Sequence, residues 1–151
     1  MLTATNNSTI DISSLESSKL LAESLINYLR KGSIVCLYGE IGVGKTTLIK
    51  NFINIYQKKN KLPLTEVTSP TFNLLNEYEI SGLIIKHYDL YRLKNKSEIN
   101  NIDLYNIDCN TITFIEWPEL VDKNKLLKSV DLIFAYENDL NNRSVKISGY
   151  T

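Results

Sequence analysis

The sequence predicts an α/β domain in which a mixed parallel and antiparallel sheet carries few flanking helices. Two stretches, 13–30 and 47–57, have the apolar spacing of amphipathic helices. Between and after them come six or seven short apolar runs typical of strands. Turn signals at 81–82 and 138–139 join neighbouring runs, so part of the sheet is expected to be antiparallel. The whole chain, 1–151, has the length of one domain.

The first part of the chain predicts an edge strand, a helix and a buried strand. Residues 1–12 are polar apart from a short alternation that fits an edge strand. Ser13 and Glu16 have the spacing of a capping box, which predicts a helix that begins there and runs to about Arg30. The apolar run at 34–38 is expected to form a buried strand.

In the second half of the chain the spacing changes from helical to extended. Apolar and β-branched residues come in short runs bounded by Gly, Pro, Asn and Asp, as in strands and turns. A Ser-Gly pair joins two of these runs into a hairpin. Only the stretch 97–105 favours a short helix. The expected strands are 73–80, 83–91, 112–116, 131–136 and 143–147.

Composition excludes several classes of protein. Hydrophobic residues make up 43% of the chain and charged residues 23%, as in an ordinary globular domain. Lys and Arg number 17, as do Asp and Glu, so net charge gives no argument for a nucleic-acid or membrane surface. Cys36 and Cys109 form no C-x-x-C pair, which indicates a reduced protein. No apolar run approaches the ~20 residues of a membrane helix, and we expect a cytoplasmic protein.

Residues 39–46 read GEIGVGKT and fit the pattern G-x-x-x-x-G-K-[ST]. They lie between a predicted strand and a predicted helix, so glycine-rich backbone and a helix N-terminus can direct several N–H groups at one anion. Lys45 is expected to reach the β- and γ-phosphates, and the Thr46 hydroxyl to bind Mg²⁺. The motif therefore predicts a nucleoside triphosphate site. The expected contacts in this loop are Gly39, Glu40, Gly42, Val43, Gly44, Lys45, Thr46 and Thr47.

Such a site also needs an acidic Mg²⁺ ligand and a group that orients the attacking water. Glu116 fits the first requirement, because it follows the apolar run 112–115 and ligands collect at the carboxyl ends of such strands. Asp89 ends another apolar run. It either orients the nucleophile or simply caps a turn.

Three further residues near these positions have ordinary structural explanations. Thr71 could contact the γ-phosphate, but it also fits a plain Pro-containing turn. His87, the sole histidine, is expected to be packed and hydrogen-bonded rather than catalytic. Trp117 is expected to pack in the core rather than to meet a partner.

The sequence lacks the characteristic motifs of two other classes of nucleotide-dependent protein, the GTPases and the P-loop small-molecule kinases. A GTPase needs an N-K-x-D guanine reader, and the nearest match, at 95–98, ends in Glu98 instead of Asp. Adenine is therefore the expected base. A P-loop small-molecule kinase needs an Arg-bearing lid, whereas only Arg92 and Arg143 lie beyond the loop.

Four sequence blocks then resemble one known family. GEIGVGKTT at 39–47, SPTF at 69–72, HYDLYRL at 87–93 and IEWP at 115–118 come in the order and spacing of the bacterial TsaE (YjeE) family. Its members are small P-loop ATPases of tRNA threonylcarbamoyladenosine biosynthesis. The first block is common to P-loop proteins, but the other three together are specific. The resemblance implies a single P-loop NTPase-like domain.

The resemblance also implies partners and a reaction. Family members act with TsaB and TsaD, which transfer a threonylcarbamoyl group to N6 of adenosine 37 in tRNAs reading codons that start with A. We therefore expect an ATPase, with ATP and Mg²⁺ as cofactors, that binds a TsaB–TsaD complex and resets it by hydrolysis. It would meet tRNA only through that complex. A P-loop kinase and a non-hydrolysing nucleotide sensor are the alternatives.

Matched motif by motif, the resemblance implies roles for individual residues. Thr46 and Glu116 correspond to Mg²⁺ ligands, and Asp89 corresponds to the residue required for hydrolysis, beside Lys45. The segment from 69 to 71 corresponds to a nucleotide-responsive loop. The expected additional nucleotide contacts are Ser69 and Thr71. Arg92 and Trp117 match conspicuous positions of the family's motifs, without a definite role.

Overall fold

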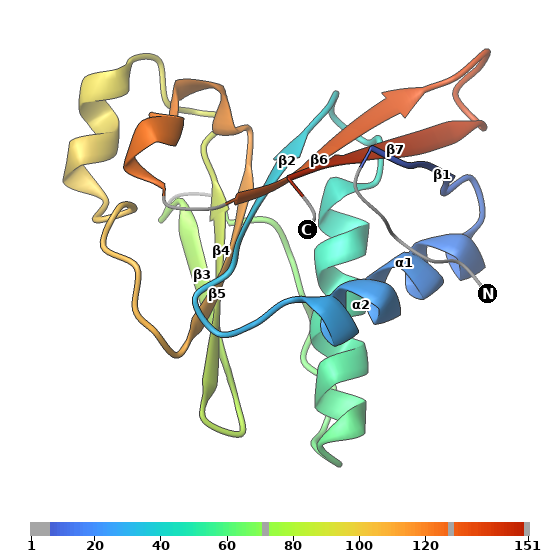
Figure 1. The fold of residues 1–151 in the computed structure, drawn as a ribbon, viewed down its shortest axis with the longest axis horizontal. Coiled ribbons are helices and arrows are strands. Elements are labelled where there is room, and N and C mark those ends of the chain that lie inside the picture. Colours follow the sequence, from blue (N-terminus) through green and yellow to red (C-terminus); the bar gives the residue numbers. More distant parts are fainter. Residues whose placement is uncertain (1–6, 71–72, 127–128, 150–151) are drawn as a thin grey trace.

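In this computed structural model, residues 7–70, 73–126 and 129–149 are described. Their strands form one sheet with the order β1-β7-β6-β2-β5-β4-β3 (Figure 1). The strands are β1 (Thr9–Asp11), β2 (Ile34–Tyr38), β3 (Leu75–Ile80), β4 (Leu83–Asp89), β5 (Thr111–Glu116), β6 (Ser129–Tyr136) and β7 (Arg143–Ser148).

The centre of the sheet is parallel and its edges are antiparallel. Strand β2 pairs in parallel with both β5 and β6, and β4 pairs in parallel with β5. Strand β3 pairs antiparallel with β4 at one edge, while β7 and β1 extend the sheet antiparallel from β6 at the other. The prediction of a mixed sheet with few helices is confirmed.

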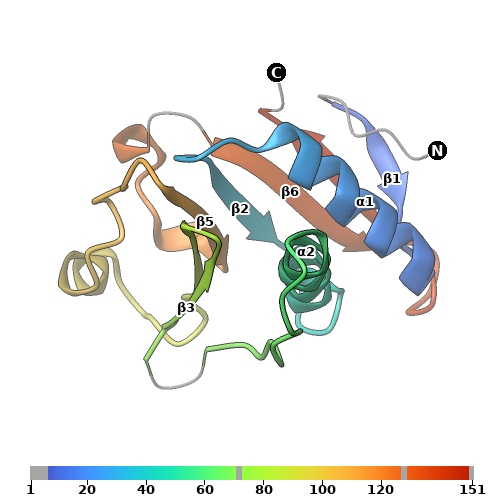
Figure 2. The same ribbon diagram turned by 90° about the horizontal axis from the view of Figure 1, so that it is seen from below.

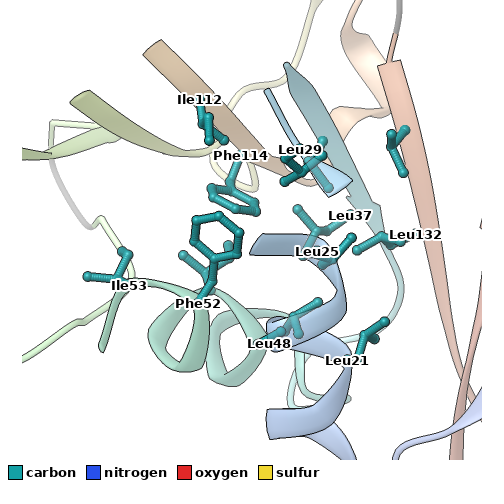
Figure 3. Close-up of a cluster of buried hydrophobic side chains, with 14 of the residues drawn as sticks. Leu21, Leu25, Leu29, Leu37, Leu48, Phe52, Ile53, Ile112, Phe114 and Leu132 are labelled. Atoms are coloured by element: carbon teal, nitrogen blue, oxygen red, sulfur yellow. The ribbon is translucent and has the colours of Figure 1, made fainter. Parts of the chain in front are cut away.

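Two helices, α1 (Leu15–Tyr28) and α2 (Lys45–Lys59), cover one face of the sheet. Figure 2 looks nearly along α2 and shows α1 beside it. Their apolar residues and those of the strands form the larger core, in which the Phe52 and Phe114 rings meet edge to face with centroids 5.0 Å apart (Figure 3). Such a pair adds directional stabilisation to the burial of both rings.

The predicted N-cap of the first helix was wrong by one residue. Ser14, not Ser13, is the N-cap, and its hydroxyl accepts a hydrogen bond of 3.1 Å from the Ser17 N–H. The Ser13 hydroxyl instead accepts from the Arg143 N–H at 2.9 Å, so this side chain ties the helix to β7. The helix ends at Tyr28, two residues before the expected end at about Arg30.

The opposite face of the sheet is covered by three short 3₁₀ segments, Lys96–Asn101, Pro118–Leu120 and Lys123–Lys125 (Figure 1). Ile99 and Leu120 from the first two segments, and Val121 and Leu126 on either side of the third, belong to or pack against a second, smaller core that includes Cys36 and Ile115. The helix expected over 97–105 is therefore one such segment, which starts earlier and ends sooner. None of the helices in the described part of the chain has the length and apolar character that a bilayer crossing requires.

The parallel strands bring three chain segments to one edge of the sheet. Strands β2, β4 and β5 run in the same direction and end at Tyr38, Asp89 and Glu116. Asp89 and Glu116 are register partners, so their backbones lie side by side. The loop that follows β2 leaves the sheet at this same edge.

Candidate functional site

The loop between β2 and α2 has a conformation that depends on glycine. Gly39 has φ +144°, and a Cβ there would come within 2.9 Å of the Phe134 Cβ. Gly44, the N-cap of α2, has φ +116°, a left-handed conformation that other residues rarely adopt. Among the residues that the structure describes, no side chain caps the N-terminus of α2, so its first N–H groups are available to an anion. This backbone fits a phosphate group.

Lys45 lies almost completely inside the site, with 4% of its surface exposed. Its ammonium donates to the Gly39 carbonyl at 2.5 Å and lies 3.6 Å from the centroid of the Trp117 ring. Burial lowers the pKa of Lys45, and the negative charges of Glu116, Asp89 and Glu119 partly oppose that change. The ammonium therefore has the Gly39 carbonyl and the face of the Trp117 ring as partners. Both bind a cation more weakly than an anionic group does.

Thr46, Glu116 and Ser69 form a polar cluster beside Lys45. The Thr46 hydroxyl donates to the Glu116 carboxylate, at 2.9 Å from Oε2 and 3.1 Å from Oε1. The Ser69 hydroxyl lies 2.8 Å from the Thr46 hydroxyl. Hydroxyl and carboxylate oxygens are the hard ligands that Mg²⁺ prefers, so the donor set of Thr46 and Glu116 fits this ion.

Glu116 has one further partner, the imidazole of His87. The His87 Nε2 lies 2.5 Å from Glu116 Oε2, and the two side chains are 0% and 3% exposed. The expectation of a packed, hydrogen-bonded histidine is confirmed, but sequence reasoning missed this contact. The sequence held no local signal for it, because the contact joins two strands that are neighbours only in the folded sheet, with His87 opposite Phe114 and Asp89 opposite Glu116.

Asp89 is less enclosed than Glu116. One of its oxygens, Oδ1, accepts a hydrogen bond of 3.0 Å from the Tyr91 N–H. Burial raises the pKa of Asp89, helped by the charge of Glu116 and opposed by the Tyr91 hydrogen bond and by His87 and Lys45. Asp89 is thus a carboxylate beside the site that has spare acceptor capacity.

The expectation that Trp117 packs in the core is confirmed, and the residue has a second position that the sequence did not indicate. It packs against the smaller core, but it also lines the site, and its φ of +57° turns the chain sharply after β5. Its ring lies 4.8 Å from that of Tyr91, which is 57% exposed. The two rings form one wall of the site.

A cavity of about 330 Å³ joins these groups. It includes most of the residues expected to contact nucleotide, but Gly39, Glu40 and Val43 are not among its lining residues. Val43 is buried in the larger core and Glu40 is exposed, and the expected nucleotide contacts of these three residues stay predictions. The lining residues are Ile41, Gly42, Gly44, Lys45, Thr46, Thr47, Ser69, Asp89, Tyr91, Glu116 and Trp117.

Three other residues complete the comparison with the sequence. Thr71 lies outside the described residues, so its expected contact stays a prediction. Arg92 is not among the residues that line the cavity. Arg143 is not a lining residue either, but it lies behind the loop: its guanidinium donates to the Ser13 carbonyl at 3.3 Å and lies 3.5 Å from where a Cβ on Gly44 would be.

Comparison with known proteins identifies the family. The family model described as "Threonylcarbamoyl adenosine biosynthesis protein TsaE" matches residues 12–145. The chain belongs to the TsaE family. The resemblance noted in the sequence motifs is therefore confirmed.

Individual TsaE proteins match most of the chain. The proteins named "tRNA threonylcarbamoyladenosine biosynthesis protein TsaE" from Rickettsia conorii and Rickettsia bellii are 38% and 37% identical, over 73% and 76% of this chain. These matches span 61% and 77% of the respective relatives. The TsaE of Aquifex aeolicus is 31% identical over 90% of this chain and 92% of its own length.

The fold is shared with a solved structure. The crystal structure of Bacillus subtilis YdiB superposes with a TM-score of 0.66, covering 95% of this chain and 86% of YdiB. Sequence identity in that superposition is 20%, so it supports the fold alone.

Proposed function

We propose that this protein is a Mg²⁺-dependent ATP hydrolase that acts in tRNA threonylcarbamoyladenosine biosynthesis. The observation that carries the proposal is the contact between Thr46 and Glu116, at 2.9 Å, beside the buried Lys45 of the glycine-rich loop. A phosphate-binding loop next to a strand-end carboxylate is the arrangement on which P-loop hydrolysis depends. Membership of the TsaE family supplies the biological process.

In this proposal the loop binds the phosphates and Lys45 neutralises their charge. Backbone N–H groups at the uncapped start of α2 donate to phosphate oxygens. The Lys45 ammonium leaves the Gly39 carbonyl and the Trp117 ring for the β- and γ-phosphates, which are much stronger partners for a cation. Lys45 thereby changes from a group that closes the loop to a group that holds the nucleotide.

Thr46 and Glu116 are the residues that would hold Mg²⁺. An ion held there would supply positive charge against the negative charge that develops on the phosphate oxygens. The Thr46 hydroxyl and the Glu116 carboxylate lie against one another, so both ligands are close together. Little ordering of side chains is then needed when the nucleotide enters.

Asp89 is the group we assign to the attacking water. Its Oδ1 accepts from Tyr91, so the second carboxylate oxygen can accept from a water in the cavity. Because burial raises the pKa of Asp89, the group is a better proton acceptor than an exposed aspartate. Asp89 would orient the water and take its proton.

The partners in this proposal are TsaB- and TsaD-like proteins, and tRNA is met only through their complex. Lys and Arg balance Asp and Glu at 17 each, whereas a protein that binds tRNA directly favours a basic face. Hydrolysis would reset the partner complex rather than perform the transfer.

The test is to measure ATP hydrolysis by the isolated protein and again with TsaB and TsaD present. We expect slow turnover alone and a clear rise with both partners. Tight binding of ATP without turnover in either condition would indicate a nucleotide sensor instead. In cells, deletion of the gene should remove threonylcarbamoyladenosine from tRNA, and an unchanged tRNA would contradict the proposed process.

A further inference from the structure

His87 is a buried polar residue on a strand whose neighbouring inward-facing position is apolar. Ile85, two residues earlier on the same face of β4, is completely buried in the larger core. His87 is also completely buried, so its ring pays a desolvation penalty that an aliphatic side chain would avoid. Its nearest polar partner is Glu116, at 2.5 Å.

The hydrogen bonds around the ring indicate where its proton lies. The Nε2 atom faces Glu116 Oε2, whereas Nδ1 is buried and has no partner among the described residues. A protonated Nδ1 in that position would be an unsatisfied buried donor, which costs about 1–3 kcal/mol. The proton therefore belongs on Nε2, and the ring donates to the carboxylate.

Glu116 is thus held from two sides. His87 donates to Oε2 from β4, and the Thr46 hydroxyl donates to the carboxylate from α2. A glutamate with free side-chain torsions loses rotamer entropy when it binds a metal, whereas a carboxylate already fixed by a neighbour loses less. In metal sites, such outer partners of a ligand contribute about 10- to 100-fold to metal affinity.

We propose that His87 positions Glu116 for Mg²⁺ binding, by holding one carboxylate oxygen so that the group is oriented toward Thr46. This inference rests on the proposed Mg²⁺–nucleotide site. His87 acts through Glu116 and is a positioning residue, with no contact to substrate. It sets the strength with which the protein binds Mg²⁺ in the presence of nucleotide, not the strength with which the loop binds phosphate.

The experiment compares His87→Leu, which removes the donor, with His87→Gln, whose amide can place an N–H near the position of Nε2. Thr113→Val is the matched control, because it also removes a buried polar group from the sheet but leaves both His87 and Thr46 in contact with Glu116. For each folded protein, calorimetry gives the affinity for ADP in EDTA and then across a Mg²⁺ titration.

We expect all variants to bind ADP in EDTA within about 2-fold of the unmodified protein. EDTA removes Mg²⁺, so Glu116 makes no contact with the metal in any of these proteins, and its orientation does not affect the free energy of ADP binding. Mg²⁺ is expected to increase the affinity for ADP. The Mg²⁺ concentration that gives half of this increase should be about 10- to 100-fold higher in His87→Leu than in the unmodified protein. His87→Gln should recover most of this loss, and Thr113→Val should match the unmodified protein. Three results would overturn the inference. They are an unchanged Mg²⁺ dependence of ADP binding in His87→Leu, an equal loss of ADP affinity in EDTA and in Mg²⁺, or a His87→Gln variant that needs as much Mg²⁺ as His87→Leu.

A second measurement does not depend on the folding of any variant. The chain has one histidine, so ¹⁵N NMR of the unmodified protein reports this ring without ambiguity. A proton on Nε2 is required, and a ring protonated on Nδ1 alone would refute the positioning role.

If the unmodified protein shows no Mg²⁺ effect on ADP binding, the proposed function fails. If Glu116→Gln loses that effect and His87→Leu keeps it, only the present inference fails.

Discussion

The ends of β4 and β5 place two carboxylates side by side in contrasting surroundings. Glu116 is 3% exposed and accepts hydrogen bonds from both His87 and Thr46. Asp89, its register partner, accepts from the Tyr91 N–H at one oxygen, and its pKa is raised by burial. A fixed carboxylate suits a metal ligand, whereas a carboxylate with spare acceptor capacity and a raised pKa suits a group that handles water. Two carboxylates at neighbouring positions of one sheet can thus differ in chemical role because their hydrogen-bond partners differ.

The sharpest test of this contrast is Asp89→Asn. The amide keeps the acceptor for Tyr91 but cannot take a proton, so ATP turnover should fall by ~10²-fold or more. Affinity for ATP with Mg²⁺ should change little, because Asp89 is not an assigned metal ligand. Steady-state ATPase assays and calorimetry measure the two quantities. Full activity in this variant would remove Asp89 from the mechanism.

Glu116→Gln should have the complementary effect. The variant keeps the size of the side chain but removes the charge that a Mg²⁺ ligand supplies, so the Mg²⁺ needed for nucleotide binding should rise by at least ~10-fold. Binding of ADP in EDTA is expected to be unchanged, and calorimetry in both conditions checks this. A variant whose ADP affinity falls equally with and without Mg²⁺ would show that Glu116 supports the loop instead.

The pKa of Asp89 predicts how stability depends on pH. Because burial raises this pKa above its ordinary value of 3.8, the folded protein binds the proton more tightly than the unfolded chain does. Ionisation of Asp89 therefore costs stability as the pH rises from 3.8 through the folded-state pKa, and the full cost persists above it. Asp89→Asn should be more stable than the unmodified protein at neutral pH.

Urea denaturation in EDTA across a pH series measures this difference. The advantage of Asp89→Asn should be largest at neutral pH and shrink as the pH falls through the folded-state pKa. A difference that does not vary with pH would mean that the substitution acts through packing, not through charge.

The smallest expected effect is that of Ser69→Ala. The Ser69 hydroxyl lies 2.8 Å from that of Thr46, but Glu116 still accepts from Thr46 when Ser69 is removed. Loss of one such hydrogen bond costs about 0.5–1.5 kcal/mol, so affinity for Mg²⁺ with ADP should fall by less than about 10-fold. Calorimetry under the conditions used for Glu116→Gln makes the comparison direct. An equal loss in both variants would make Ser69 a member of the metal site in its own right.

The sequence predicted most of the sheet because its signals are local. Apolar runs and turn residues located the strands, and the glycine-rich motif marked the strand–loop–helix unit around Lys45. The cap of the first helix was misplaced by one residue because Ser13 and Ser14 both suit the position. Only the pairing of Ser13 with Arg143 on β7 decides between them.

The candidate site was predictable where a residue sits at a strand end, and less so where a contact joins distant strands. The position of Glu116 followed from its place after an apolar run. Its contact with His87 required the knowledge that β4 and β5 are neighbours in parallel register, which no local pattern contains. The same is true of Arg143, which approaches the loop from the end of the chain. The roles of these residues stay predictions.

The contact of Lys45 with Trp117 also gives the protein an optical probe of its own. The chain contains one tryptophan, and its ring lies 3.6 Å from the ammonium that the proposed nucleotide would draw away. Selective excitation of tryptophan therefore reports a single position, at the wall of the cavity. A change of emission on adding nucleotide would follow the departure of Lys45 in real time, without any attached label.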